Sequence, residues 1–191
     1  MSLRNWIARK AWGAAGKLAL NGYDAYAVNP GIEDVWHLRG FGYLSSMGVR
    51  IFDMSCPAVI GANDLIYLYM PADRIVADIL EKSDGLTIVD ITGDVFGLVA
   101  PDDVPQYAKI RGSNSEAMRW WRDPEHPERI EALARSLRAA TVVTTSFDYL
   151  VNPLREFNDN VVLLPDAQPV GDKSFVQNFH KIVDNFGKSE R

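Results

Sequence analysis

Apolar residues fall along the chain in two kinds of pattern, short continuous runs and longer stretches with helical spacing. Six short runs have the length and β-forming composition of strands: residues 25–28, 49–52, 65–70, 86–89, 141–144 and 161–164. A strand that is apolar at every position is typical of a parallel sheet covered on both faces. We therefore expect the strands at 65–70, 86–90 and 161–164 to be central and parallel.

Helical spacing predicts helices before, between and after these strands. The predicted helices cover about residues 3–21, 33–47, 71–83, 130–140 and 174–186. Pro71 is predicted to occupy the first helical position, and Ser146 is a predicted N-cap. After Ser146 the helix either kinks at Pro153 or restarts there with Asn152 as its cap.

Alternating strands and helices predict the α/β class. We expect a three-layer, Rossmann-like, doubly wound domain over residues 1–171, with a mostly parallel sheet of about six strands. Residues 172–191 are expected to form a C-terminal amphipathic helix that packs on this domain or on a partner. The apolar stripe of that helix consists of Phe175, Phe179, Ile182, Val183 and Phe186.

Composition narrows the class of protein. The 191 residues are 47% hydrophobic and 24% charged, which are globular values. The single cysteine, Cys56, excludes an intramolecular disulfide and a multi-cysteine metal site. A net charge of −5 argues against nucleic acid as a partner. With no secretory pattern and no apolar stretch of membrane-span length, a cytoplasmic location is the default expectation.

The first 23 residues differ from the rest in charge. They contain four basic residues and no acidic one, with Trp6 and Trp12 among them. Such a segment suits an anionic membrane surface, which would make the protein membrane-peripheral, and its composition is also that of a transit peptide. The alternative is a surface helix that packs on the domain through its apolar stripe.

Common catalytic and cofactor motifs are absent from the sequence. It has no GxGxxG, no GxxxxGK[ST] and no GxSxG. The three histidines, His37, His126 and His180, match no zinc spacing. We therefore expect no metal and no tightly bound cofactor.

Polar residues that follow the predicted strands are the candidate site, because ligands of open α/β sheets bind beyond the carboxyl ends of the strands. Asp90 and Asp94 are the candidate catalytic acids. The candidate substrate-binding residues are Asn29, Gly31, Asp90, Thr92, Asp94 and Ser146. The alternative is that Asp94 caps a turn and Asp90 is solvated. Three tryptophans could stack on a sugar ring or fill the core: Trp36, Trp120 and Trp121.

The run AATVVTTSFDYLVNPLREFNDNVVLLP, residues 139–165, resembles a segment of GT-B glycosyltransferases of the group 1 type. In those enzymes a strand ending in Thr or Ser leads into an S-x-x-Y/F-L-x-x-P-L-x-x-F helix, followed by N-x-N-V-x-V-L-P. The matching positions begin at Ser146 and include Tyr149, Pro153 and Phe157. A second block, residues 64–96, resembles the family's strand–helix–strand–acidic loop–Phe segment. Thr92 and Gly93 replace two of the usual adjacent acids there.

The resemblance implies the acceptor-binding half of a nucleotide-sugar-dependent enzyme. Members of the family have two Rossmann-like domains, and this chain resembles the first one alone. A nucleotide-sugar donor is then implied only where a second domain is supplied, for example by a donor-domain subunit. The alternative functions are a non-catalytic carbohydrate- or protein-binding module and a peripheral membrane adaptor that uses the basic N-terminal helix. The alternative to a donor-domain subunit as partner is a second copy of this chain, in a homo-oligomer.

Overall fold

A computed structural model of the chain describes residues 20, 22–29, 41–53, 59–107, 123–167 and 174–187. Its six strands are β1 (Asp24–Asn29), β2 (Arg50–Asp53), β3 (Asp64–Tyr69), β4 (Leu86–Ile91), β5 (Val142–Thr145) and β6 (Val161–Leu163). They form one parallel sheet with the order β2-β1-β3-β4-β5-β6. The predicted α/β, Rossmann-like class is therefore confirmed.

The chain divides into two compact units. Unit 1 consists of residues 1–67, 84–86 and 166–191, and unit 2 consists of residues 68–83 and 87–165. Strands β3 and β4 contribute residues to both units, and each unit is described below by itself.

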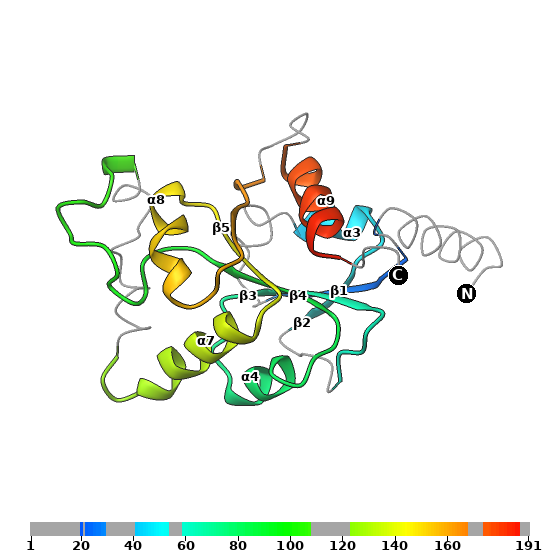
Figure 1. Cartoon of the computed structure of the whole chain (residues 1–191), viewed down its shortest axis with the longest axis horizontal. Coiled ribbons are helices and arrows are strands. Elements are labelled where there is room, and N and C mark those ends of the chain that lie inside the picture. The colour runs from blue at the N-terminus through cyan, green and yellow to red at the C-terminus, as the bar shows by residue number, and fades with distance from the viewer. Residues whose placement is uncertain are drawn as a thin grey trace. The chain divides into compact units, whose positions relative to one another are not determined.

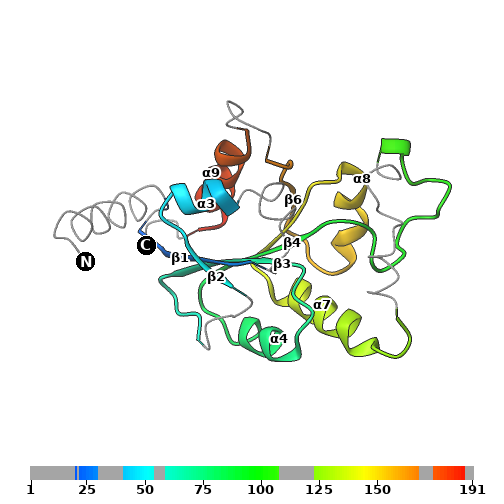
Figure 2. The same cartoon turned by 180° about the vertical axis from the view of Figure 1, so that it is seen from behind.

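Unit 1 has an aromatic core beneath two helices, α3 (Phe41–Ser46) and α9 (Ser174–Phe186). Both helices lie on the same side of β1 in Figures 1 and 2. The ring of Phe179 lies 6.0 Å from that of Tyr67, and the ring of Phe175 lies 6.4 Å from that of Tyr43. Phe175 and Phe179 are fully buried, so the apolar stripe of α9 covers residues of its own chain.

A close backbone approach leads into β3 in unit 1. A Cβ atom added to Gly85 would lie 2.6 Å from the carbonyl oxygen of Asp64 and 2.7 Å from that of Gly61. The amide of Gly61 donates in turn to the Asp64 carboxylate at 2.8 Å. Because the neighbouring atoms are backbone, only glycine fits at position 85 without displacing the chain.

Unit 2 places helices on both faces of its part of the sheet. Helix α4 (Arg74–Leu80) packs against α7 (Pro127–Ala139) on one face. Helix α8 (Asp148–Val151) lies on the other face, as Figures 1 and 2 show from opposite sides. A short 3-10 helix, η1 (Pro153–Glu156), follows α8.

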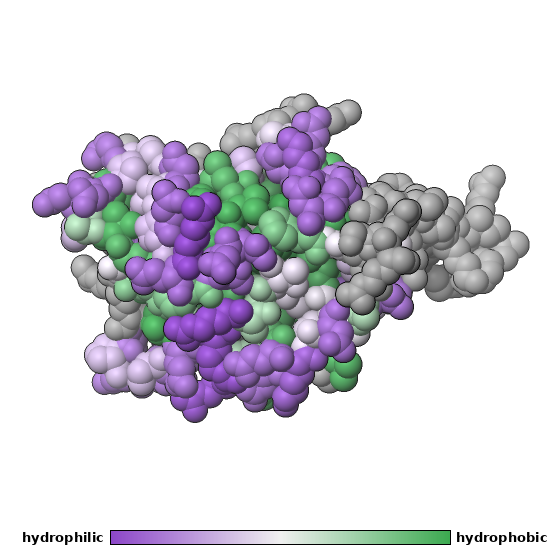
Figure 3. Space-filling model, viewed as in Figure 1, coloured by the Kyte–Doolittle hydropathy of each residue, from purple (hydrophilic) through white to green (hydrophobic). Residues whose placement is uncertain are grey.

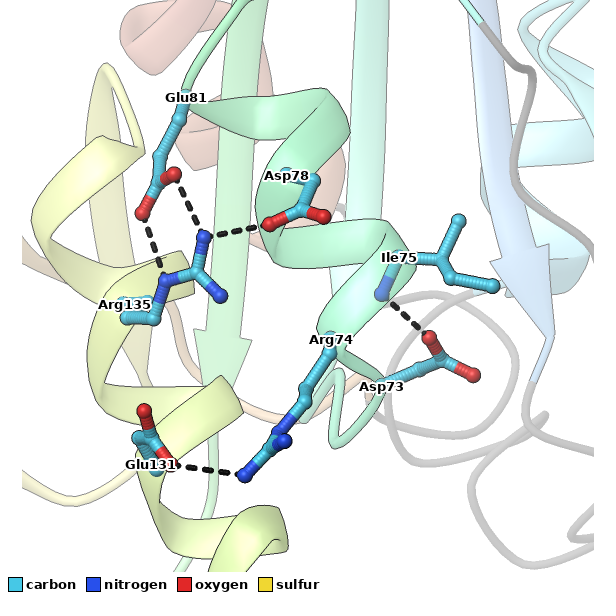
Figure 4. A network of polar contacts seen from close by, with 7 residues as sticks. All are labelled: Asp73, Arg74, Ile75, Asp78, Glu81, Glu131 and Arg135. Carbon is cyan, nitrogen blue, oxygen red and sulfur yellow. Dashed lines mark hydrogen bonds and ion pairs between the residues drawn. The ribbon is translucent and has the colours of Figure 1, made fainter.

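Ion pairs join the exposed sides of α4 and α7 (Figure 4). The guanidinium of Arg135 on α7 donates to Glu81 at 2.6 and 2.8 Å and to Asp78 at 2.5 Å. A second pair joins Arg74 to Glu131 at 3.1 Å. The hydrogen bonds from Arg135 lower the pKa of Asp78 and of Glu81 below their ordinary values. Hydrophilic side chains gather over these two helices in Figure 3, which is the solvated side expected of an amphipathic helix pair.

The segment that carries the GT-B resemblance folds as strand, helix, 3-10 helix and strand, and its asparagines join these elements. The side chain of Asn158 donates to the carbonyls of Leu137 at 2.9 Å and Ala140 at 2.7 Å. The side chain of Asn160 donates to the Thr141 carbonyl at 3.0 Å. These bonds fix the end of α7 and the start of β5 beside the start of β6. Of the two alternatives at Pro153, the structure has the restart: η1 begins at Pro153, with Asn152 before it as N-cap residue but without a side-chain cap hydrogen bond.

Three predictions about individual elements are wrong. Helix α4 begins at Arg74 and not at Pro71, because the Asp73 carboxylate accepts a hydrogen bond from the Ile75 amide and caps the helix there. Phe147, not Ser146, is the N-cap of α8. The run 161–164 is predicted to be a central strand, but β6 is an edge strand and Leu163 is 40% exposed.

Candidate functional site

Strands β4 and β5 of unit 2 end side by side. Ile91 is in register with Thr145, so the next residues, Thr92 and Ser146, leave the sheet at the same level. Neighbouring strands lie about 4.8 Å apart. The parallel topology therefore brings together two residues that are 54 positions apart in sequence, and both were predicted as substrate-binding.

Asp90 is the last residue but one of β4 and is completely buried. The hydroxyl of Thr144, its register partner on β5, donates to Asp90 Oδ1 at 2.5 Å. Buried carboxylates are stable only when they accept hydrogen bonds of this kind. Asp90 is therefore neither solvated nor within direct reach of a ligand, and its position suits it to hold Thr144 and the ends of β4 and β5 in place.

Asp94 caps the turn that follows β4. Its two carboxylate oxygens accept hydrogen bonds from the amides of Leu98, at 2.8 Å, and Val99, at 2.9 Å. Gly93 and Gly97 have φ angles of 82° and 71°, a region that favours glycine, and they allow the chain to fold back around the carboxylate. With 4% of Asp94 exposed, this acid supports a loop, which is the alternative role that the sequence allowed for it.

A chain of polar contacts links the ends of β3 and β4. The hydroxyl groups of Tyr69 and Thr92 lie 2.6 Å apart, and the Thr92 hydroxyl also donates to the sulfur of Met70 at 3.6 Å. The Met70 amide donates to the Asp90 carbonyl at 2.8 Å. Met70 has a φ of 43°, and a non-glycine residue in this region is uncommon. Strained backbone of this kind often accompanies functional sites.

Ser146 adds a third hydroxyl to this edge. The residue is half-buried, and its side chain has no hydrogen-bond partner among the residues that the structure describes. The following amide, that of Phe147, donates to the Thr145 hydroxyl at 3.2 Å instead. The Ser146 hydroxyl is therefore available to a ligand as donor and acceptor.

The structure brings four of the six predicted site residues together in unit 2: Asp90, Thr92, Asp94 and Ser146. Asn29 ends β1 in unit 1, and Gly31 lies outside the described residues, as do Trp36, Trp120 and Trp121. Sequence reasoning missed Tyr69. The signal that could have found it is its position as the last residue of a buried strand.

The described parts of the chain contain no group of three or more His, Cys, Asp or Glu side chains that could hold a metal ion. Within the same parts, no helix has both the length and the apolar character of a membrane span. The basic segment 1–23, on which the membrane hypothesis depends, is described only at residues 20, 22 and 23.

Among Tyr69 and the predicted site residues of unit 2, the accessible groups are uncharged hydroxyls, while both candidate acids are buried and already accept hydrogen bonds. Such an arrangement suits recognition of an uncharged, hydroxyl-rich ligand, because each hydroxyl can donate and accept. It offers no exposed catalytic base from Asp90 or Asp94. Comparison of the chain with protein-family models, with curated proteins and with solved structures found no match.

Proposed function

We propose that this chain is the acceptor-side domain of a GT-B-type, nucleotide-sugar-dependent glycosyltransferase, and that it holds a polyhydroxylated acceptor at the carboxyl edge of unit 2. The observation that carries the proposal is the group of hydroxyls at the ends of three neighbouring strands. Tyr69 and Thr92 form one hydroxyl pair, at 2.6 Å, and Ser146 follows β5 at the level of Thr92.

The sequence resemblance supports the same proposal through the scaffold. The residues shared with the GT-B segment include Asn158 and Asn160, whose side chains join α7, β5 and β6. They fix the start of β5, the strand that Ser146 follows. In this proposal, the shared motif builds the edge and the hydroxyl groups bind the acceptor.

The chemistry of the edge favours an acceptor over a donor. A nucleotide-sugar donor carries a diphosphate, which proteins bind with cationic side chains or helix N-termini. Hydroxyl groups and buried carboxylates do not provide that attraction. Transfer would then require a separate donor domain, because both substrates must be held together in the correct orientation.

A second function, a carbohydrate-binding module without catalysis, is favoured by one specific observation. Both oxygens of Asp94 accept backbone amides, and Asp90 is fully buried beside Thr144. An acid used in this way cannot take a proton from an acceptor hydroxyl without a rearrangement. The two functions share the binding site and differ only in turnover.

Titration calorimetry with methyl glycosides tests the binding site. Relative to wild type, Thr92→Val and Ser146→Ala should each weaken binding about tenfold, because each removes one hydrogen bond to a ligand hydroxyl. Ser136→Ala is the matched control, since Ser136 is buried in α7, and its affinity should equal that of wild type. Unchanged affinity in both edge variants would refute the proposal.

An assay of UDP or GDP released from a nucleotide-sugar distinguishes a glycosyltransferase domain from a non-catalytic binding module. The chain alone should neither turn over UDP- or GDP-sugars nor bind them more tightly than about millimolar. Micromolar binding of a nucleotide-sugar to the chain alone would contradict the acceptor-side assignment. Sugar transfer that begins when a donor domain is added would favour the enzyme, and glycoside binding without transfer would favour the module.

A further inference from the structure

We propose that Tyr107, Asp148 and Ser146 form a stacking subsite for one pyranose ring at the carboxyl end of β5. The inference rests on the proposed function, and it adds the class of ring that the acceptor presents and the groups that hold it. All three residues belong to unit 2.

Tyr107 provides a supported aromatic surface. Its ring stacks on that of Phe147, with centroids 6.5 Å apart and an angle of 26° between the planes. Phe147 is itself buried, and its ring lies 5.6 Å from that of Tyr149 on α8. Tyr107 is nevertheless 44% exposed. A ring that is already fixed loses little conformational entropy when a ligand stacks on it.

A carboxylate lies at the edge of this ring. The Tyr107 hydroxyl donates to Asp148 Oδ1, and the Tyr149 amide donates to the same oxygen at 2.8 Å. Asp148 is exposed, and its second oxygen, Oδ2, has no hydrogen-bond partner among the described residues. Two bonds therefore orient the carboxylate, while one oxygen remains available to accept a hydrogen bond.

Tyr107 and Asp148 are in contact through their hydrogen bond, and Ser146 lies two residues before Asp148 in the chain. Ser146 precedes Phe147 directly, and Phe147 supports the ring of Tyr107. The segment that ends at residue 107 (green) comes beside α8 (yellow) in both Figure 1 and Figure 2. The aromatic face and the fixed carboxylate are thus joined to the residues that directly follow Ser146, which leaves β5 at the level of Thr92.

This combination selects a pyranose. The C–H face of a pyranose packs on an aromatic ring, and its hydroxyls donate to a carboxylate and exchange hydrogen bonds with a serine. An anionic ligand would be repelled by Asp148. A flat apolar ligand would use the ring and leave the carboxylate and the serine without a role.

Saturation-transfer NMR on the full chain tests the subsite, with the methyl glycosides of glucose, galactose, mannose and N-acetylglucosamine as probes. In wild type we expect transfer to be strongest at the C–H protons of one ring face. Tyr107→Ala and Tyr107→Leu should each weaken binding about tenfold, because both remove the flat ring. Tyr107→Phe keeps the ring and leaves the Tyr149 amide to orient Asp148, so it should lose less binding than Tyr107→Ala.

A control variant shows whether a loss of binding is specific to the subsite, and comparison with Thr92→Val distinguishes failure of the subsite from failure of the proposed function. Tyr26→Ala removes a half-exposed tyrosine of unit 1, whose ring contacts Arg50, and should leave the signal unchanged. If Tyr107→Ala binds as wild type does while Thr92→Val loses binding, the subsite is wrong and the proposed function stands. The reverse result supports the subsite and refutes the acceptor site at Thr92. Equal losses in Tyr107→Phe and Tyr107→Ala, or no transfer to wild type from any probe, would overturn the stacking subsite.

Discussion

The two units bury different kinds of side chain. Unit 1 is held by aromatic contacts between α9, α3 and the sheet, with Phe179 at its centre. Tyrosines aside, unit 2 contains all the polar and charged side chains that are buried in the described part of the chain: Thr87, Asp90, Asp94, Ser136, Thr144 and Thr145. Apolar contacts tolerate small displacements, whereas buried polar groups require a partner at a fixed position. Unit 2 therefore has buried hydrogen bonds between side chains, such as that of Thr144 with Asp90, and it is the unit with the candidate site.

The largest expected effect is in unit 1. Phe179→Ala should lower the free energy of unfolding by about 4 kcal/mol, since it leaves a cavity against Tyr67 and Phe175. Denaturant titration measures the loss. Phe186→Ala, at the half-buried end of the same helix, is the control and should lose much less. Similar losses in the two variants would mean that the aromatic core does not centre on Phe179.

In unit 2, the next largest loss of stability is expected from removing the buried hydrogen bond between Thr144 and Asp90. Thr144→Val keeps the shape of the side chain but leaves Asp90 Oδ1 without the donor now at 2.5 Å. The expected loss is about 2 kcal/mol, the range for a hydrogen bond to a charged group. Thr144→Ser retains the hydroxyl and should lose less than Thr144→Val. If Val is tolerated better than Ser, shape and not the hydrogen bond dominates at this position.

A substitution at Ser136, also in unit 2, is expected to stabilise the fold instead of destabilising it. Its hydroxyl is buried in α7 and has no partner among the described residues. Ser136→Ala should raise the free energy of unfolding by about 1 kcal/mol, because it removes an unsatisfied polar group and improves helix propensity. Ser45→Ala, at an exposed position of α3, should change thermal stability little. A lower melting temperature for Ser136→Ala would show that the hydroxyl has a partner in solution.

The smallest effect concerns the exposed ion pairs between α4 and α7. Because Arg135 lowers the pKa of Asp78 and Glu81 in the folded state, its stabilising contribution is present above their unfolded values, about pH 4, and is lost as the pH falls further. The difference in melting temperature between wild type and Arg135→Gln should therefore be positive at neutral pH and disappear toward about pH 3.

Salt provides an independent check on the ion pairs. The difference in melting temperature between wild type and Arg135→Gln should shrink in about 1 M salt, where charges on exposed side chains are screened. Arg74→Gln removes a single pair, that with Glu131, and should show a smaller dependence on pH. A difference that is constant from about pH 3 to pH 7 would contradict the electrostatic explanation.

Much of the scaffold could be predicted from the sequence because it depends on local patterns. Continuous apolar runs revealed the strands, and helical spacing revealed α7 and α9. The order of the strands depends on tertiary packing, so the edge position of residues 161–164 was missed. The predicted start of α4 at Pro71 is also wrong, because the nearby Asp73 side chain caps the helix.

The candidate site could be predicted only in part. The ends of the strands revealed Asp90, Thr92, Asp94 and Ser146, because polar residues after apolar runs are visible in one sequence. The role of each depends on partners far away. The bond between Thr144 and Asp90 joins residues 54 positions apart, and the stack of Tyr107 on Phe147 joins residues in different segments. One sequence gives no signal for either pair.

Amide-resolved NMR titration of the wild-type chain with the methyl glycoside that gives the strongest saturation transfer tests the central claim most directly. The account predicts that the largest chemical-shift changes cluster at the ends of β3, β4 and β5, around Met70, Thr92 and Ser146. Helix α9 and the exposed sides of α4 and α7 should show little change. Saturable binding whose largest shifts fall on α9 or on the α4–α7 pair, with none at the carboxyl edge of unit 2, would contradict it.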